Sequence, residues 1–259
     1  MKYTSDVPTT TLQLKTPDGP CTTELAVPDG SGPWPAVIVF TDAAGLRPAQ
    51  TRIAERIARS GYAALQPDLF HRSPPLETFL GEPPTLVAMR TVFQDPELKA
   101  KFMAGYYGPA LDYGNLERTI GALLDHVAGR PDVRGGVGMT GYCMGGNACV
   151  RAATIFGKRI AAAAAFHPGW LVTEQPDSPH VRASTIGARL YLAPATGDLA
   201  AESEGKLRAE LDARQVRYEI EHYAAGHGYA VDDSPVYDPV FAERHYAALD
   251  RLFGQTLRT

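Results

Sequence analysis

The stretch TGYCMGGNA, residues 140–148, places Cys143 at the centre of a glycine-rich turn that directly follows the short apolar run Val137-Gly138-Met139. Three roles suit a cysteine in such a turn. It can be a thiol nucleophile at the start of a helix, a part of a glycine loop that cradles phosphate, or a small buried hydrophobic residue. The sequence on both sides of the turn decides among these roles.

Strand-like and helix-like patterns alternate along most of the chain. Two β-rich runs separated by the turn Pro17-Asp18-Gly19-Pro20 predict an N-terminal hairpin, at residues 9–15 and 21–27. Further strand-like, mostly apolar runs predict strands at residues 36–40, 62–66, 136–140, 160–166, 189–192 and 216–223. Helical spacing predicts helices at residues 49–60, 115–128, 145–156, 200–214 and 238–253. This alternation predicts an α/β fold with a mostly parallel central sheet and helices on both faces.

One segment, residues 71–114, interrupts the alternation. It opens with the proline-rich stretch HRSPPLETFLGEPP, and its spacing predicts short helices at residues 86–93 and 96–104. We expect one domain over residues 1–259 with this segment as an insertion. Connections of such length usually carry function, so the insertion is either a lid over a pocket or a packing element on the surface.

Composition and charge exclude several classes of partner. A formal net charge of −4 offers no attraction to nucleic acid or to an anionic membrane. No stretch approaches the roughly 18 apolar residues that span a bilayer, and the first residues lack an apolar leader. The spacing of Cys21, Cys143 and Cys149 fits neither a disulfide framework nor a CxxC motif. This cysteine pattern favours a location in the reducing cytoplasm. The sequence is compatible with a monomer or a homodimer.

The phosphate-loop role rests on residues 136–141, GVGMTG, which match G-x-G-x-x-G letter for letter. That motif must follow a strand and open a helix. Here the glycines lie inside or before the predicted strand, and no acidic strand end follows about twenty residues later. The match is therefore accidental.

The nucleophile role has a physical basis in the glycines on either side of Cys143. A strand–turn–helix elbow forces its central residue into a strained backbone conformation, and Gly141 and Gly145 remove side chains that would collide there. The thiol would then lie at a helix N-terminus, where free N–H groups and the helix dipole stabilise a thiolate. The alternative is an inert buried cysteine. Cys149, in the middle of the next helix, is expected to pack in the core.

A nucleophile in such an elbow is followed in chain order by an acid and a histidine, each in a loop after a later strand. Asp198 follows the predicted strand 189–192, and His227 lies between two glycines after the strand that ends at residue 223. Taken alone, Asp198 could cap the next helix, and His227 could be a surface residue. All three residue types, in order and at strand ends, favour a catalytic triad.

Four segments together resemble the dienelactone hydrolase family of α/β-hydrolases over nearly the whole chain: GYCMGG, YAALQPDLF, ATGD and AGHGY. The resemblance implies that Cys143 is the nucleophile, His227 the general base and Asp198 its partner. It also implies that the acid after the first buried strand, Asp42, contacts the resting thiol, although the family residue is usually the longer glutamate. Alternatively, Asp42 caps the loop that leads into the next helix.

The implied chemistry is attack of the thiolate on an ester or lactone carbonyl, with the backbone N–H groups of Ala43 and Met144 as the oxyanion hole. His227 would then activate water to hydrolyse the thioester. The resemblance requires no metal and no organic cofactor.

Substrate recognition is expected to differ from that of family members that act on dienelactone. Those members use arginines for the substrate carboxylate, one of them four residues after the histidine, where this chain has Val231. An uncharged, moderately hydrophobic ester or lactone therefore fits better. We expect a pocket lined by His167 and Trp170, which follow the strand 160–166, and by aromatic residues of the insertion, Phe79, Phe102, Tyr106 and Tyr107. Alternatively, His167 is a core or loop histidine with satisfied nitrogens.

Two other functions would use the same turn. A non-catalytic member of the fold would bind a ligand or sense redox state through Cys143. A thiol-dependent acyl transferase would form the acyl-enzyme but release little product to water.

Overall fold

Eight strands form one sheet in the computed structural model of the protein, which describes residues 7–258. In chain order the strands are β1 (Thr9–Thr16), β2 (Gly19–Ala26), β3 (Trp34–Phe40), β4 (Ala63–Pro67), β5 (Val133–Tyr142), β6 (Ile160–Phe166), β7 (Arg189–Ala193) and β8 (Tyr218–Ile220). Their spatial order is β1-β2-β4-β3-β5-β6-β7-β8. The β1–β2 and β2–β4 pairs are antiparallel, and every pair from β4 to β8 is parallel. The predicted hairpin and the mostly parallel sheet are therefore confirmed.

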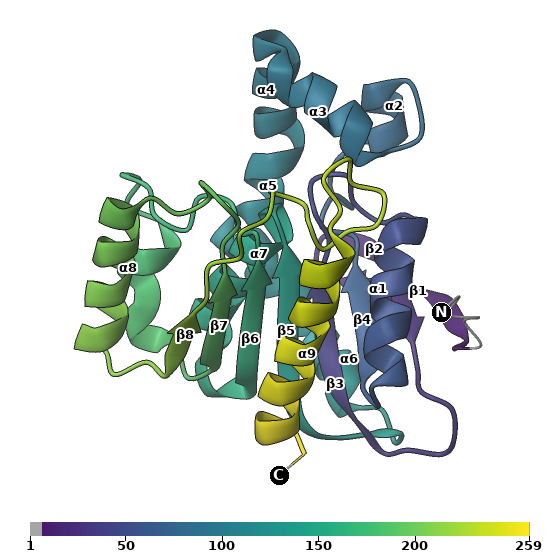
Figure 1. Ribbon diagram of the computed structural model, residues 1–259. Coiled ribbons are helices and arrows are strands. Elements are labelled where there is room, and N and C mark those ends of the chain that lie inside the picture. The colour runs from purple at the N-terminus through teal and green to yellow at the C-terminus, as the bar shows by residue number, and fades with distance from the viewer. Residues whose placement is uncertain (1–6, 259) are drawn as a thin grey trace.

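Long helices connect the parallel strands, and a last one follows β8. They are α1 (Pro48–Arg59), α6 (Tyr113–Ala128), α7 (Met144–Phe156), α8 (Ala201–Ala213) and α9 (Pro239–Thr256). Figure 1 shows α1 and α9 in front of the sheet and α6 and α7 behind it. Two short 3-10 segments, η2 (Gly157–Arg159) and η3 (Pro179–Thr185), flank β6.

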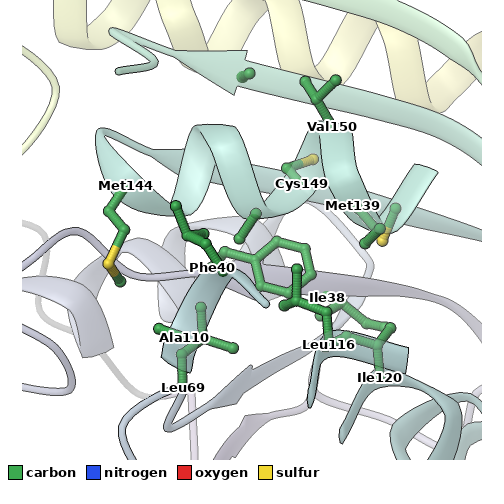
Figure 2. Close-up of a cluster of buried hydrophobic side chains, with 14 of the residues drawn as sticks. Ile38, Phe40, Leu69, Ala110, Leu116, Ile120, Met139, Met144, Cys149 and Val150 are labelled. Atoms are coloured by element: carbon green, nitrogen blue, oxygen red, sulfur yellow. The ribbon is translucent and has the colours of Figure 1, made fainter. Parts of the chain in front are cut away.

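The apolar side chains of strand β3 pack into two hydrophobic cores, one on each face of the sheet. Successive side chains of a strand point to opposite faces, so Val37 and Val39 pack with α1 and α9 while Ile38 and Phe40 pack with α6 and α7. Figure 2 shows the second cluster, with Phe40 close to Cys149 of α7. Cys149 is fully buried, and burial raises the pKa of its thiol, so its predicted role in the core is confirmed.

Between β4 and α6 the chain forms a group of short helices: α2 (Leu76–Leu80), α3 (Leu86–Gln94), α4 (Pro96–Phe102), the π-helical turn η1 (Met103–Tyr107) and α5 (Gly108–Leu111). Figure 1 shows α2, α3 and α4 above the carboxyl ends of the parallel strands. Phe102 is fully buried among aromatic rings of this segment and of the loop after β4. The ring centroid of Phe102 lies 5.7–6.5 Å from those of Phe70, Phe79, Phe93, Tyr106 and Tyr107. The segment therefore has an aromatic core of its own.

The glycines around Cys143 permit a close approach between β3, β5 and α7. A Cβ atom on Gly145 would lie 2.3 Å from the backbone oxygen of Phe40 and 2.4 Å from that of Thr41. A Cβ atom on Gly141 would lie 2.0 Å from the backbone oxygen of Gly145. These contacts are with backbone atoms, which cannot rotate away as a side chain would. Glycine at both positions is thus a steric requirement of the turn.

We expect Gly145→Ala to lower the free energy of unfolding by about 3 kcal/mol, because the new methyl group overlaps two backbone oxygens. The matched control is Gly205→Ala in α8, where a Cβ atom meets nothing within 4 Å. That change should instead stabilise the protein by roughly 0.5–1 kcal/mol, since alanine favours the helix. Urea unfolding measures both changes, and equal stabilities of the two variants would contradict the steric explanation.

Candidate active site

Cys143 forms the turn between β5 and α7 and has φ of 53° and ψ of −116°. L-residues with a β-carbon rarely adopt positive φ, so this backbone is strained. Hydrogen bonds on both sides hold it: the Cys143 N–H donates to the Phe166 carbonyl at 3.1 Å, and the Cys143 carbonyl accepts from Gly146 at 3.0 Å. The thiol is partly exposed, unlike the buried thiols of Cys21 and Cys149.

Asp198 and His227 come from the loops after β7 and β8 and form a direct hydrogen bond. His227 Nδ1 lies 2.7 Å from Asp198 Oδ1. The second carboxylate oxygen of Asp198 accepts from the Ala195 N–H at 2.9 Å, which fixes the carboxylate. Helix α8 has no side-chain cap at its N-terminus, so Asp198 does not have the capping role considered as its alternative.

The pKa of His227 reflects both neighbours. Burial alone would lower it, but the hydrogen bond to Asp198 and the interaction with the Cys143 thiol outweigh burial and raise the pKa to about 10. The structure therefore brings together the three residues that the sequence singled out. An imidazole between a carboxylate and a thiol can accept the thiol proton and keep the resulting charge paired.

Met144, which follows Cys143 in the chain, and Ala43, which lines the same cavity, each carry a backbone N–H group that could serve as an oxyanion donor. Met144 is the first residue of α7, and Ala43 follows β3 in the turn that also contains Asp42. Within residues 7–258, neither N–H has a hydrogen-bond partner. Ala43 lines the same cavity as Cys143. Unpaired N–H groups beside a nucleophile are suited to hold an oxyanion.

Asp42 has different partners from those the family resemblance implied. Its Oδ1 accepts from the Ala44 N–H at 2.9 Å and from Arg47 at 2.7 Å, and its Oδ2 accepts from Arg47 at 2.9 Å and from Gln50 at 2.8 Å. Four donors fill the lone-pair positions of the two oxygens. The expectation that Asp42 contacts the resting thiol is therefore corrected: this carboxylate anchors its own loop to Arg47 and Gln50.

A cavity of about 610 Å³ opens above Cys143. Its lining comes from the turn after β3, the insertion, and the loops that follow β5, β6, β7 and β8, and includes Asp42, Ala43, Leu86, Met89, Arg90, Phe93, Tyr107, Cys143, His167, Gly169, Trp170, Gly197, Asp198, His227, Gly228, Ser234, Pro235 and Val236. Of the expected pocket residues, His167, Trp170 and Tyr107 line this cavity. Phe79, Phe102 and Tyr106 do not: they pack in the aromatic core of the insertion.

His167 is a buried residue of the cavity wall, only 1 % exposed, and neither ring nitrogen has a partner among the described residues. This differs from the alternative of a histidine with satisfied nitrogens. Its ring meets the His227 ring at a centroid distance of 5.0 Å. Burial, together with the nearby His227, lowers the pKa of His167 well below its usual value, so it is a neutral imidazole.

Arg90 and the loop 234–236 are parts of the cavity that the sequence did not reveal. Arg90 lies on α3 beside Leu86, Met89 and Phe93, and its exposed side chain makes no ion pair or hydrogen bond within residues 7–258. The helix itself was predicted, and its i, i+3, i+4, i+7 spacing carries the signal that these four residues share one face. Nothing in the sequence indicated that this face turns toward Cys143.

Other site types find less support. Residues 136–141 lie within β5, so they do not form a phosphate loop. Residues 7–258 contain no group of three or more His, Cys, Asp or Glu side chains placed to hold a metal ion. In the same part of the chain, no helix has both the length and the apolar character needed to cross a bilayer.

Comparison with known proteins gives one family. A model of the dienelactone hydrolase family matches residues 22–257. A Synechocystis sp. protein provisionally described as a carboxymethylenebutenolidase is 26 % identical over 98 % of this chain and 100 % of its own.

Solved structures show the same fold. A provisionally described dienelactone hydrolase from Klebsiella pneumoniae superposes with a TM-score of 0.79 at 19 % identity, over 96 % of this chain and 99 % of its own. A dienelactone hydrolase-like promiscuous phosphotriesterase from metagenomic libraries superposes with a TM-score of 0.71 at 25 % identity, over 96 % and 99 % of the two chains. The sheet order and these likenesses identify the α/β-hydrolase fold.

Raising the pH should remove the stability that the ion pair between Asp198 and His227 contributes. The pKa of His227 rises from an ordinary 6.5 to about 10 on folding, so this contribution is complete below pH 6.5 and is lost as the pH approaches 10. It should not exceed about 1 kcal/mol, because the His227 side chain is 41 % exposed.

Urea unfolding of the wild type and of His227→Gln at about pH 6, 8 and 10 tests this prediction. The stability difference between them should shrink as the pH rises. His222→Gln, which removes an exposed histidine–carboxylate pair with Glu204, controls for loss of a surface imidazole. A His227→Gln difference that stays constant over this range would contradict the prediction.

Proposed function

The chain belongs to the dienelactone hydrolase family, and from this membership and the site geometry we propose that it is a cysteine-dependent hydrolase of small carboxylic esters or lactones. One observation carries the proposal. Cys143, His227 and Asp198 come from three separate loops, yet they lie around one cavity with His227 hydrogen-bonded to Asp198 and in contact with the thiol. Acyl transfer to a thiol requires a nucleophile, a base that handles its proton and an acid that orients the base.

The first half-reaction is acylation of Cys143. The proton of the Cys143 thiol resides on His227, whose pKa is raised, and the sulfur attacks the substrate carbonyl carbon to form a tetrahedral intermediate. The negative charge on the carbonyl oxygen is stabilised by the N–H groups of Ala43 and Met144, which are free of other partners. The intermediate then expels the alcohol, to which His227 returns the proton, and a thioester remains on Cys143.

The second half-reaction is hydrolysis of the thioester. His227 accepts a proton from water while the water oxygen attacks the thioester carbonyl. Asp198 keeps Nδ1 of His227 protonated and stabilises the imidazolium that forms. Collapse of the second tetrahedral intermediate releases the carboxylic acid and restores the thiol.

The cavity wall indicates the substrate class. Leu86, Met89, Phe93 and Val236 give the cavity an apolar wall, which suits a hydrophobic acyl or alcohol group. Val231, where the family resemblance implied a substrate-binding arginine, is fully buried and contributes to the core. We propose that residues 71–114 act as a lid: α3 supplies one wall, and Tyr107 touches Trp170 of the opposite loop at a ring centroid distance of 5.1 Å.

Cys143→Ala should abolish hydrolysis of small aryl esters, with a loss in kcat of about 10³-fold or more, because no other group forms the covalent intermediate. His227→Ala should cause a similar loss. Mass spectrometry of the wild type after mixing with a slowly hydrolysed ester should show the acyl mass on Cys143.

Three other outcomes would each favour a different function. Full activity in Cys143→Ala would remove the cysteine mechanism. Tight binding of esters without turnover would favour a ligand-binding protein. Accumulation of the acyl-enzyme without release to water, relieved by added thiols or amines, would favour an acyl transferase.

Arg90 tests the charge of the substrate. Because this cation lines the cavity and has no partner within residues 7–258, Arg90→Gln should raise KM about 5-fold for an ester that carries a second carboxylate. KM for the neutral ester of the same shape should stay within about 2-fold, since no charge is lost from its contacts. The control is Arg134→Gln, an exposed cation on β5 outside the cavity. Equal changes in KM for both esters would mean that Arg90 does not discriminate between charged and neutral substrates.

A further inference from the structure

Arg47, at the N-terminus of α1, is a buried guanidinium held between two carboxylates. It is only 7 % exposed, and Asp42 is 1 % exposed. Its Nη1 and Nη2 donate to the two oxygens of Asp42 at 2.7 and 2.9 Å. Its Nε and Nη2 donate to the two oxygens of Asp233 at 2.6 and 2.9 Å. The remaining donor of Nη1 reaches the Gly45 carbonyl at 3.2 Å, so all five guanidinium N–H groups have an acceptor.

The two carboxylates belong to two different segments that contribute to the lining of the catalytic cavity. Asp42 directly precedes Ala43, whose N–H is one proposed oxyanion donor. Asp233 directly precedes residues 234–236, which line the cavity in the same loop that contains His227. Arg47 and Asp233 are 186 positions apart in the chain. A single guanidinium therefore joins the turn of the oxyanion hole to the loop of the histidine.

This arrangement fixes geometry more strongly than it stabilises the fold. Burial opposes the charge of Arg47, but the hydrogen bonds to Asp233 and the charge of Asp42 outweigh burial and raise its pKa. Removing charges from water offsets much of their attraction, so a buried pair adds little net stability. Two forked pairs on one planar group, by contrast, define both distance and orientation, which a lysine ammonium cannot do.

We propose that Arg47 is a positioning residue for the reaction: it holds the Ala43 N–H at the place where the oxyanion forms, by clamping Asp42 to Asp233. This inference rests on the proposed cysteine hydrolase function. Both half-reactions place negative charge on the same carbonyl oxygen, so a displaced Ala43 N–H slows both. Displacements of about 1 Å at an oriented site are enough to cost a large part of the rate.

The chain offers a matched control in Arg52. This residue also lies on α1 and also forms a forked pair with the loop after His227, through Nε and Nη2 to the two oxygens of Asp232 at 2.6 Å each. Its side chain is 51 % exposed, and it does not touch Asp42. Arg52→Gln thus removes a tie between the same two elements without disturbing the oxyanion turn.

The experiment compares Arg47→Gln, Arg47→Lys, Asp233→Asn and Arg52→Gln by two rates. The first is kcat for a small aryl ester, together with KM. The second is alkylation of Cys143 by iodoacetamide, a reaction of the thiol that forms no oxyanion. We expect Arg47→Gln to lower kcat by about 10-fold or more while alkylation stays within about 2-fold of the wild type. Arg47→Lys should restore little of kcat, and Arg52→Gln should retain both rates.

Asp233→Asn decides the matter if Arg47→Gln fails to fold, since it leaves the buried pair of Arg47 with Asp42 intact and loosens only the second fork. It should lower kcat and spare alkylation. Unchanged kcat in a folded Arg47→Gln or Asp233→Asn protein, or alkylation that falls in step with kcat, overturns the positioning role. A wild type that neither turns over nor acylates removes the proposed function and this inference together, whereas an active wild type beside an equally active Arg47 variant removes this inference alone.

Discussion

The site depends on the close approach of three backbones around Cys143. A positive φ at this residue is unfavourable in an unfolded chain, and it persists because strand β5, helix α7 and the turn after β3 meet without side chains between them. Gly141 and Gly145 are the residues that allow it. The same approach brings the Ala43 turn beside the first N–H groups of α7. The strained backbone of Cys143 and the N–H groups proposed as oxyanion donors are thus consequences of one packing arrangement.

The parallel strands explain how the remaining groups reach the thiol. Strands β5, β6 and β7 all run in one direction, so the residues after them gather at one edge: Cys143, His167 and Asp198. His227 reaches the same edge from the loop after β8. Arg47 then joins the turn after β3, through Asp42, to the loop after β8, through Asp233. Loops are usually the most mobile parts of a fold, and here two of them share the buried guanidinium of Arg47.

The sequence predicted the groups whose position follows from the order of strands and loops along the chain. It did not predict contacts that depend on where a side chain points in the folded protein. Strand runs, elbow glycines and the order of cysteine, acid and histidine are local or ordinal signals, so the sheet, the helices and the meeting of Asp198 with His227 could be predicted. The partners of Asp42 could not, because Arg47 resembles an ordinary helix-start cation until Asp233 is brought to it from 186 positions away. Phe102 and Tyr106 were placed in the cavity because composition alone does not tell an aromatic core from an aromatic wall.

The wall of the cavity contains buried polar groups without hydrogen-bond partners in the described part of the chain, and such groups are uncommon in a protein core. Both nitrogens of His167 and the hydroxyl of Tyr107 are buried without a partner within residues 7–258, and each such group costs about 1–3 kcal/mol. His167 also adopts a positive φ, as do Cys143 and Trp170, so strain and unpaired groups coincide around the thiol. Two imidazoles 5.0 Å apart cannot both be charged cheaply, and since Asp198 stabilises the charge on His227, His167 remains neutral. A neutral His167 places no second positive charge beside His227, and its ring nitrogens, unpaired among the residues that the structure describes, carry a cost in stability that the rest of the fold must offset.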